Sequence, residues 1–121
     1  MELKTLEGQF SVCKVSSLAG FDMSSRLFFI GRTDRELSLV CPTEDVLEET
    51  LRRDDGWKAF RIEGELDFSL TGILAKLSAV LAQQEIGIFA VSTYDTDYIL
   101  VKSENFDRAL SALAQEGYTV I

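Results

Sequence analysis

The apolar residues in the second half of the chain switch repeatedly between two regular spacings, and this switching constrains the fold more than any other feature. In 57–66, Phe60 and Ile62 stand two residues apart, which is the period of a half-buried β-strand. From Gly72 the apolar residues recur every third or fourth position, which is typical of an amphipathic helix, here ending before Gly87. The sequence therefore predicts a strand followed by a helix.

The rest of this half repeats the same order of elements. Residues 87–93 and 98–102 favour strands, and the polar stretch between them is typical of a β-hairpin tip. Ser103 is a candidate N-cap for a second helix that Gly117 ends, and the chain closes with the strand-like 118–121. The order β-α-β-β-α-β predicts a ferredoxin-like α+β unit, with both helices on one face of a four-stranded antiparallel sheet.

The first half of the chain is a loose copy of this pattern without its first helix. Strands are predicted over 10–15, 27–31 and 37–40, and a short helix from Pro42, whose fixed φ suits a first helical turn. The strand at 86–91 has apolar residues on both faces, which is typical of a central strand, so we expect the degenerate half to pack against the second.

The boundary between the halves is predicted at a turn formed by Asp54, Asp55 and Gly56. We therefore expect a degenerate half at 1–55 and a complete unit at 56–121. The strand at 57–63 fits either role, closing the first unit or opening the second.

Charge and composition exclude several classes of function. The 121 residues carry a net charge of −8, divided evenly between the halves, so the surface repels polyanions on average. We expect no nucleic-acid partner and no binding to anionic membranes. No apolar run approaches the roughly 20 residues of a membrane span, and the N-terminus lacks the layout of a signal peptide, which favours the cytoplasm.

Histidine is absent, which removes the usual general base near neutral pH and the commonest zinc ligand. Cys13 and Cys41 lie among strand-like apolar residues and are expected to be buried thiols. Asp95 and Asp97 have the spacing of cation-binding loops, but further oxygen ligands at matching offsets are missing. We expect a protein that is not an enzyme and that has no metal site and no cofactor.

The second half resembles the ACT domain family over residues 57–121. The stretch SLTGILAKLSAVLAQQEIGIFAVSTYDTDYILV is similar to the branch found in small bacterial tandem-ACT proteins and in CASTOR-type amino-acid sensors. The usual ACT opening, Asp-x-Pro-Gly-x-Leu, is replaced in part, because Ser69 and Thr71 stand where Asp and Pro are usual, whereas Gly72 and Leu74 match. The resemblance implies a regulatory module that binds an effector amino acid at an interface between ACT units.

An amino-acid receptor needs anion donors and a cation acceptor close together. The start of the predicted helix, at 70–72, offers free backbone N–H groups for a carboxylate, and the hairpin tip offers oxygen atoms for an ammonium group. We expect these two loops to be neighbours at one end of the sheet or to meet across an interface. The predicted ligand-binding residues are Leu70, Thr71, Gly72, Ser92, Thr93, Asp95 and Asp97.

Each of these features also has a purely structural interpretation. Gly72 is compatible with helix packing alone, and Asp95 and Asp97 are compatible with a hairpin turn that bonds its own backbone. An acylphosphatase-like enzyme is disfavoured because the acidic loop 63–72 has no arginine, and RNA binding lacks a basic rim. We expect a homodimeric module for a free amino acid or similar zwitterion; the alternative is a dimerisation module without a ligand.

Overall fold

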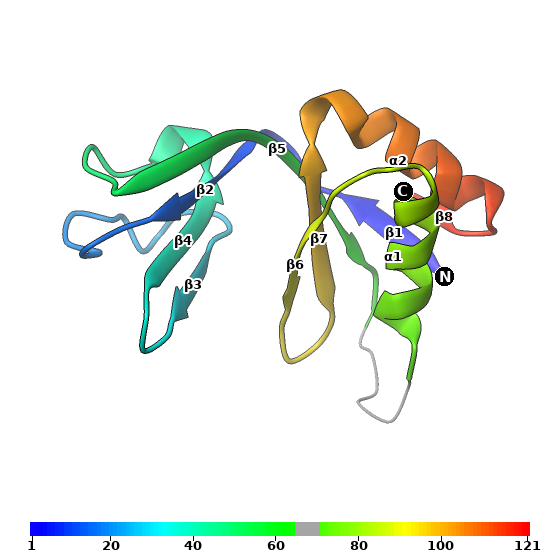
Figure 1. Ribbon diagram of the computed structural model, residues 1–121, viewed down its shortest axis with the longest axis horizontal. Helices are drawn as coiled ribbons and strands as arrows, with labels where there is room; N and C mark the ends of the chain where they lie inside the picture. Colours follow the sequence, from blue (N-terminus) through cyan, green and yellow to red (C-terminus); the bar gives the residue numbers. More distant parts are fainter. Residues whose placement is uncertain (65–70) are drawn as a thin grey trace. The chain divides into compact units, whose positions relative to one another are not determined.

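The computed structural model describes residues 1–64 and 71–121, which form two compact units. Unit 1 consists of Met1–Glu7 and Lys58–Ile121, and unit 2 of Gly8–Trp57. The elements, drawn in Figure 1, are β1 (Glu2–Thr5), β2 (Phe10–Lys14), β3 (Phe29–Arg32), β4 (Leu37–Pro42), the 3-10 helix η1 (Thr43–Asp45), β5 (Arg52–Ile62), α1 (Ile73–Gln83), β6 (Phe89–Ser92), β7 (Asp97–Lys102), α2 (Ser103–Gln115) and β8 (Thr119–Val120).

The sheet of unit 1 has the strand order β6-β7-β5-β1-β8. The predicted ferredoxin-like order is present, and the α+β fold class is confirmed. The predicted four strands are joined by β1, which pairs antiparallel with β5 and parallel with β8 and so separates those two strands. The prediction of a central strand at 86–91 is wrong, because β6 lies at the edge and pairs with β7 alone among the described strands.

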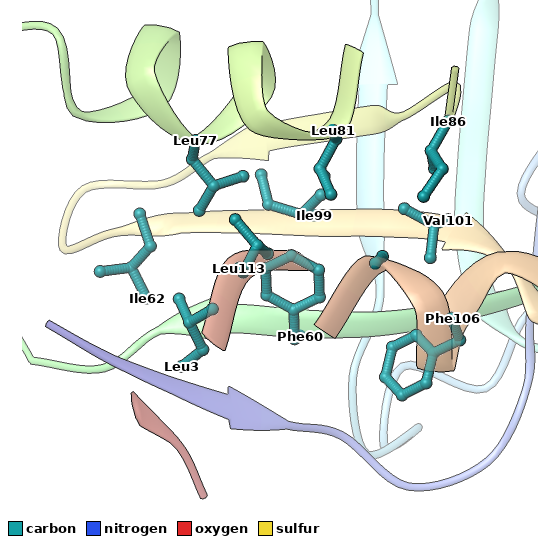
Figure 2. Packing of buried hydrophobic residues seen from close by; sticks show 11 residues of the cluster. Leu3, Phe60, Ile62, Leu77, Leu81, Ile86, Ile99, Val101, Phe106 and Leu113 are labelled. Atoms are coloured by element: carbon teal, nitrogen blue, oxygen red, sulfur yellow. The ribbon is translucent and has the colours of Figure 1, made fainter. Parts of the chain in front are cut away.

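Both helices pack on the same face of this sheet and bury a common core (Figure 2). β1 contributes Leu3 and β5 contributes Phe60, and neither side chain is exposed to solvent. α1 and α2 cover them with Leu77 and Leu113, which follow the predicted helical spacing. Burial of side chains of this size stabilises the fold by roughly 2 kcal/mol each. The core of unit 1 therefore lies between one face of the sheet and the apolar sides of the two helices.

The helix boundaries follow glycine positions closely. α1 begins after Gly72, which has a left-handed backbone with φ of 76°. The predicted cap of the second helix is displaced by one residue, because Lys102 is the N-cap and Ser103 is the first helical residue. Gly117, with φ of 97°, follows the end of α2 and turns the chain into β8.

Unit 2 is an antiparallel sheet with the strand order β3-β4-β2-β5. Its core contains both cysteines, which are buried free thiols as predicted, and Leu39. The segment between β2 and β3 contains no helix, as its Ser and Gly content predicts. The predicted helix at Pro42 is reduced to η1, a single 3-10 turn.

The predicted turn at Asp54, Asp55 and Gly56 is wrong, because these residues lie inside β5. They form a β-bulge in which Ser11 of β2 stands opposite two residues, between the pairs Phe10↔Trp57 and Val12↔Asp54. Gly56 adopts the required positive φ of 83°. The strand therefore continues past the predicted boundary, with Arg52–Trp57 in unit 2 and the remainder in unit 1.

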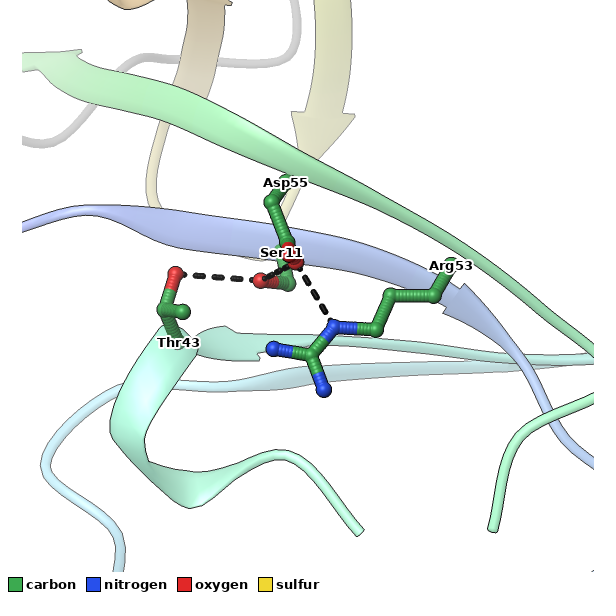
Figure 3. Close-up of polar contacts among 4 residues, drawn as sticks. All are labelled: Ser11, Thr43, Arg53 and Asp55. Atoms are coloured by element: carbon green, nitrogen blue, oxygen red, sulfur yellow. Dashed lines mark hydrogen bonds and ion pairs between the residues drawn. The ribbon is translucent and has the colours of Figure 1, made fainter. Parts of the chain in front are cut away.

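A polar network centred on the buried Ser11 holds this bulge (Figure 3). The Ser11 hydroxyl, which is inaccessible to solvent, donates to Asp55 Oδ1 at 2.5 Å, and Arg53 Nε donates to the same oxygen at 2.8 Å. Because Ser11 has one hydroxyl hydrogen, the 3.0 Å contact with Thr43 Oγ1 has Thr43 as the donor. The network links β2, β5 and η1 within unit 2.

Candidate functional site

The hairpin between β6 and β7 carries four of the predicted ligand residues. Its tip is closed by Thr93, whose backbone N–H donates to the Thr96 carbonyl at 2.8 Å and whose hydroxyl donates to the same carbonyl at 3.0 Å. The Ser92 hydroxyl donates to Asp97 Oδ1 at 2.5 Å across the two strands. Ser92, Thr93 and Asp97 thus already have partners within the hairpin.

Thr96 fixes the hairpin tip to the neighbouring strand. Its hydroxyl donates to the backbone carbonyl of Ile62 at 2.7 Å, and the residue is 8% exposed. Asp95 lies next to this anchor and is exposed, and no hydrogen bond to its carboxylate is found among residues 1–64 and 71–121. The anchored hairpin turn therefore places Asp95 beside the end of β5.

The end of β5 supplies a cation to the same place. Arg61 alternates with the core residues Phe60 and Ile62, so its side chain lies on the sheet face away from the helices. Its Nε lies 3.4 Å from Glu63 Oε2. A hydrogen bond with Tyr98 and then one with Glu63 raise the pKa of Arg61, so its guanidinium stays charged at all working pH values.

These residues surround one open hollow of about 290 Å³. Thr93 and Asp95 line it from the hairpin, and Arg61 and Glu63 line it from β5. The hollow therefore presents a guanidinium and two carboxylates to a ligand of a few heavy atoms. A guanidinium binds a ligand carboxylate, and a carboxylate binds an ammonium group, so the arrangement can hold a zwitterion.

The helix start lies in a different hollow. Thr71 and Gly72 line a space of about 220 Å³ together with Lys76 of α1 and Tyr118 before β8. A side chain at Gly72 would meet no atom within 4 Å, so the glycine leaves the backbone open, although its φ of 76° disfavours other residues. Leu70 lies outside the described residues. Among residues 1–64 and 71–121, the hollow lined by the hairpin and the hollow lined by the helix start have no lining residue in common.

Sequence reasoning missed Arg61, Glu63 and Tyr98 as lining residues. The alternation in 57–66 was informative about the buried face, and it also places Arg61 on the opposite face. The signal that was available is a charged residue between two core residues on the strand that precedes the helix. In the part of the chain that the structure describes, no group of three or more acidic or thiol side chains is placed to hold a metal ion. No helix there is long and apolar enough to span a membrane.

A family model described as an ACT domain matches residues 52–115 of this chain. Protein Atu0741 from Agobacterium tumefaciens is 32% identical with a TM-score of 0.89, over 99% of this chain and 91% of that chain. Protein VC0802 from Vibrio cholerae is 21% identical with a TM-score of 0.74, over 92% of this chain and 85% of that chain. The regulatory subunit of aspartate kinase from Thermus thermophilus is 12% identical with a TM-score of 0.68, over 93% of this chain and 95% of that chain. The last two likenesses concern the fold.

Proposed function

The chain belongs to the ACT domain family, and from this premise we propose that it is a non-catalytic regulatory module that binds a free amino acid or a similar zwitterion. The observation that carries the proposal is the hollow at the end of β5, where Arg61 and Asp95 supply opposite charges. The likeness in fold to an aspartate kinase regulatory subunit supports a regulatory role.

In this proposal the ligand carboxylate approaches the Arg61 guanidinium and the ligand ammonium approaches the Asp95 carboxylate. Arg61 is held by Glu63 and Tyr98, so little side-chain freedom is lost on binding. Thr93 and Thr96 lie beside Asp95 and fix the hairpin. The site is therefore preorganised, with Arg61 on strand β5 and Asp95 in a hairpin turn that hydrogen bonds hold in place.

We further propose a cytoplasmic homodimer of the tandem-ACT kind, related to CASTOR-type amino-acid sensors. Thr71 and Gly72 line a separate hollow. We therefore propose that these two residues and Leu70 hold the carboxylate of a ligand that is bound across the dimer interface. Sedimentation at micromolar concentration tests the dimer, and a monomer would contradict this part of the proposal.

A thermal-shift screen against the common amino acids tests the function. A ligand at about 100 times its Kd stabilises the native state by about 2.7 kcal/mol, which raises Tm by several degrees. We expect a shift with at least one amino acid, lost in Asp95→Asn and retained in Asp107→Asn, which removes an exposed carboxylate on α2. No shift with any amino acid would contradict the proposal and would favour the ligand-free dimerisation module.

A further inference from the structure

Unit 2 has a hollow of about 230 Å³ at the tip of the β3–β4 hairpin. It is lined by three cations, Lys14, Arg32 and Arg35. Thr33 in the turn and Leu51 line it as well. Leu51 is 58% exposed, which offers apolar surface beside the charges. The hollow therefore combines positive charge with a small apolar wall.

This hollow is the counterpart, within unit 2, of the one proposed to bind an amino acid. Both lie where a strand ends beside a hairpin tip that is closed by a threonine. Thr33 donates its backbone N–H to the Glu36 carbonyl at 2.9 Å, just as Thr93 donates to Thr96 at 2.8 Å, and in both turns the threonine hydroxyl contacts the backbone three residues on. The two turns are thus equivalent in structure.

The charge is opposite at one of two equivalent positions and the same at the other. Arg35 follows Thr33 by two residues, where the other hairpin has Asp95 two residues after Thr93. Lys14, the last residue of β2, precedes a buried Val15 in the way that Arg61 precedes a buried Ile62. Unit 2 therefore keeps the strand-end cation and carries a second cation, Arg35, at the position of Asp95, with the acids Asp34 and Glu36 on either side of it.

One further cation increases the positive charge at this end of unit 2. Arg52 stands directly opposite Lys14 in the β2–β5 register, and both are exposed. Like charges directly opposite on neighbouring strands destabilise a sheet. By contrast, Arg26 and Arg53 of the same unit pair with Glu44 and Asp55.

Among the described residues, no ion pair compensates Lys14, Arg32, Arg35 or Arg52. Two acids line the same hollow. Glu36 accepts a hydrogen bond from the Ser38 hydroxyl at 2.7 Å, and Asp34 is exposed. The lining has three cations against two acids, an excess of one positive charge in a protein whose net charge is −8, so it is compatible with an anion.

We propose that this hollow binds a small organic dianion, a phosphate monoester or a dicarboxylate. Lys14, Arg32 and Arg35 supply the charge, and the forked guanidinium groups match either anion bidentately. Leu51 faces the carbon part of the ligand. This site is separate from the amino-acid site proposed above, and the two bind ligands of different charge.

The experiment compares thermal unfolding in inorganic phosphate, in malonate and in sodium chloride at equal ionic strength. The wild-type Tm rises by about 5 °C at ten times the Kd of the binding anion. Phosphate and malonate distinguish the two ligand classes. Lys14→Gln raises Tm in chloride by about 1–2 °C, because it removes the repulsion from Arg52, and it abolishes the anion response. Lys4→Gln, which removes an exposed cation of unit 1, leaves the anion response unchanged.

Backbone amide NMR localises the response. The proposal expects anion-dependent shifts at Lys14 and at 32–37. Equal Tm values in all three salts, an anion response that survives in Lys14→Gln, or shifts confined to unit 1 would each overturn it. A response to a single-stranded oligonucleotide without any response to phosphate or malonate would overturn it as well. Failure of the amino-acid screen leaves these readouts unaffected, so the two proposals can fail independently.

Discussion

Units 1 and 2 each contain a β-sheet that includes part of β5, but different elements cover the two sheets. Unit 1 covers its sheet with two amphipathic helices, whose buried residues include Leu77 and Leu113. Unit 2 has no α-helix among its residues and uses an irregular segment and η1, which bring Phe21 and Val46 to its core. The comparison shows that one strand can pair in both units while serving one core, because β5 contributes Phe60 and Ile62 to the core of unit 1 and no residue to the core cluster of unit 2.

The polar interactions of the two units differ as well. In unit 2 the Ser11 hydroxyl is fully buried and donates to Asp55 at the bulge. In unit 1 the comparable serine–aspartate bond, Ser92 to Asp97, lies on an exposed hairpin. The buried Ser11 hydroxyl cannot exchange its partners for water, although the Asp55 side chain is 50% exposed, so unit 2 depends on its network more than unit 1 depends on its hairpin.

The largest effect is expected from Leu3→Ala, which tests whether β1 belongs to the core of unit 1. The Leu3 side chain is fully buried between β5 and the helices, so its truncation removes apolar contacts and leaves a cavity. We expect a loss of about 3 kcal/mol in the free energy of unfolding, measured by denaturant titration. Leu51→Ala, at a side chain that is 58% exposed, serves as the control and is expected to cost less than about 0.5 kcal/mol. Equal costs for the two variants would contradict the place given to β1.

A smaller effect is expected from Ser11→Ala. The substitution removes the hydrogen bonds of Ser11 to Asp55 and Thr43; because the Asp55 side chain is 50% exposed and becomes hydrated, we expect a cost of about 1–1.5 kcal/mol in the free energy of unfolding. Ser92→Ala removes a bond of the same 2.5 Å length at an exposed position and is expected to cost about 0.5 kcal/mol. If both variants lose the same stability in urea, the contrast between a buried and an exposed network is wrong.

The next prediction concerns how the free energy of unfolding changes with pH above 9. Burial raises the pKa of Cys41 from its usual 9.0 to about 12. Because the thiol ionises more readily in the unfolded chain, the stability that it contributes is complete below pH 9 and is lost as the pH rises toward 12. The free energy of unfolding should therefore fall less steeply over this range in Cys41→Ala than in the wild type. An identical slope in both proteins would show that the thiol does not take part.

Thiol labelling gives this comparison a second readout. Both cysteines lie in the core of unit 2, so their reaction with a thiol reagent reports the opening of that unit. At pH 8 the folded protein is expected to react far more slowly than the unfolded chain, because only the exposed thiolate is a good nucleophile. Rapid labelling of the folded protein would contradict the burial of Cys13 and Cys41.

Much of unit 1 was predictable because its elements carry local signals. The helical spacing in 73–83 and 103–115 and the hairpin at 89–102 each follow from neighbouring residues. β1 was missed because its sequence ELKT has a single core residue, Leu3. Its partners lie at the other end of the sequence, such as Val120 in β8, so no local pattern marks the pairing.

The bulge and the hollow show two other limits of local patterns. A Gly with positive φ, here Gly56, suits both a turn and a β-bulge, and the contact with Ser11 that decides between them joins distant residues. The hairpin residues Thr93 and Asp95 could be singled out from their chemistry. Arg61 could not be assigned to the same hollow, because that depends on how β7 pairs with β5.

The central claim is that the β5 hollow of unit 1 binds an amino acid and that its counterpart in unit 2 does not. An NMR titration with an equimolar mixture of the common amino acids other than aspartate and glutamate, which are themselves dicarboxylates, tests this directly when it is read at the backbone amides. The account predicts shifts at 61–64 and 93–96, which disappear in Asp95→Asn and persist in Arg35→Gln, the variant at the equivalent hairpin position of unit 2. No shift at any amide, or shifts at 32–37 alone, would contradict it.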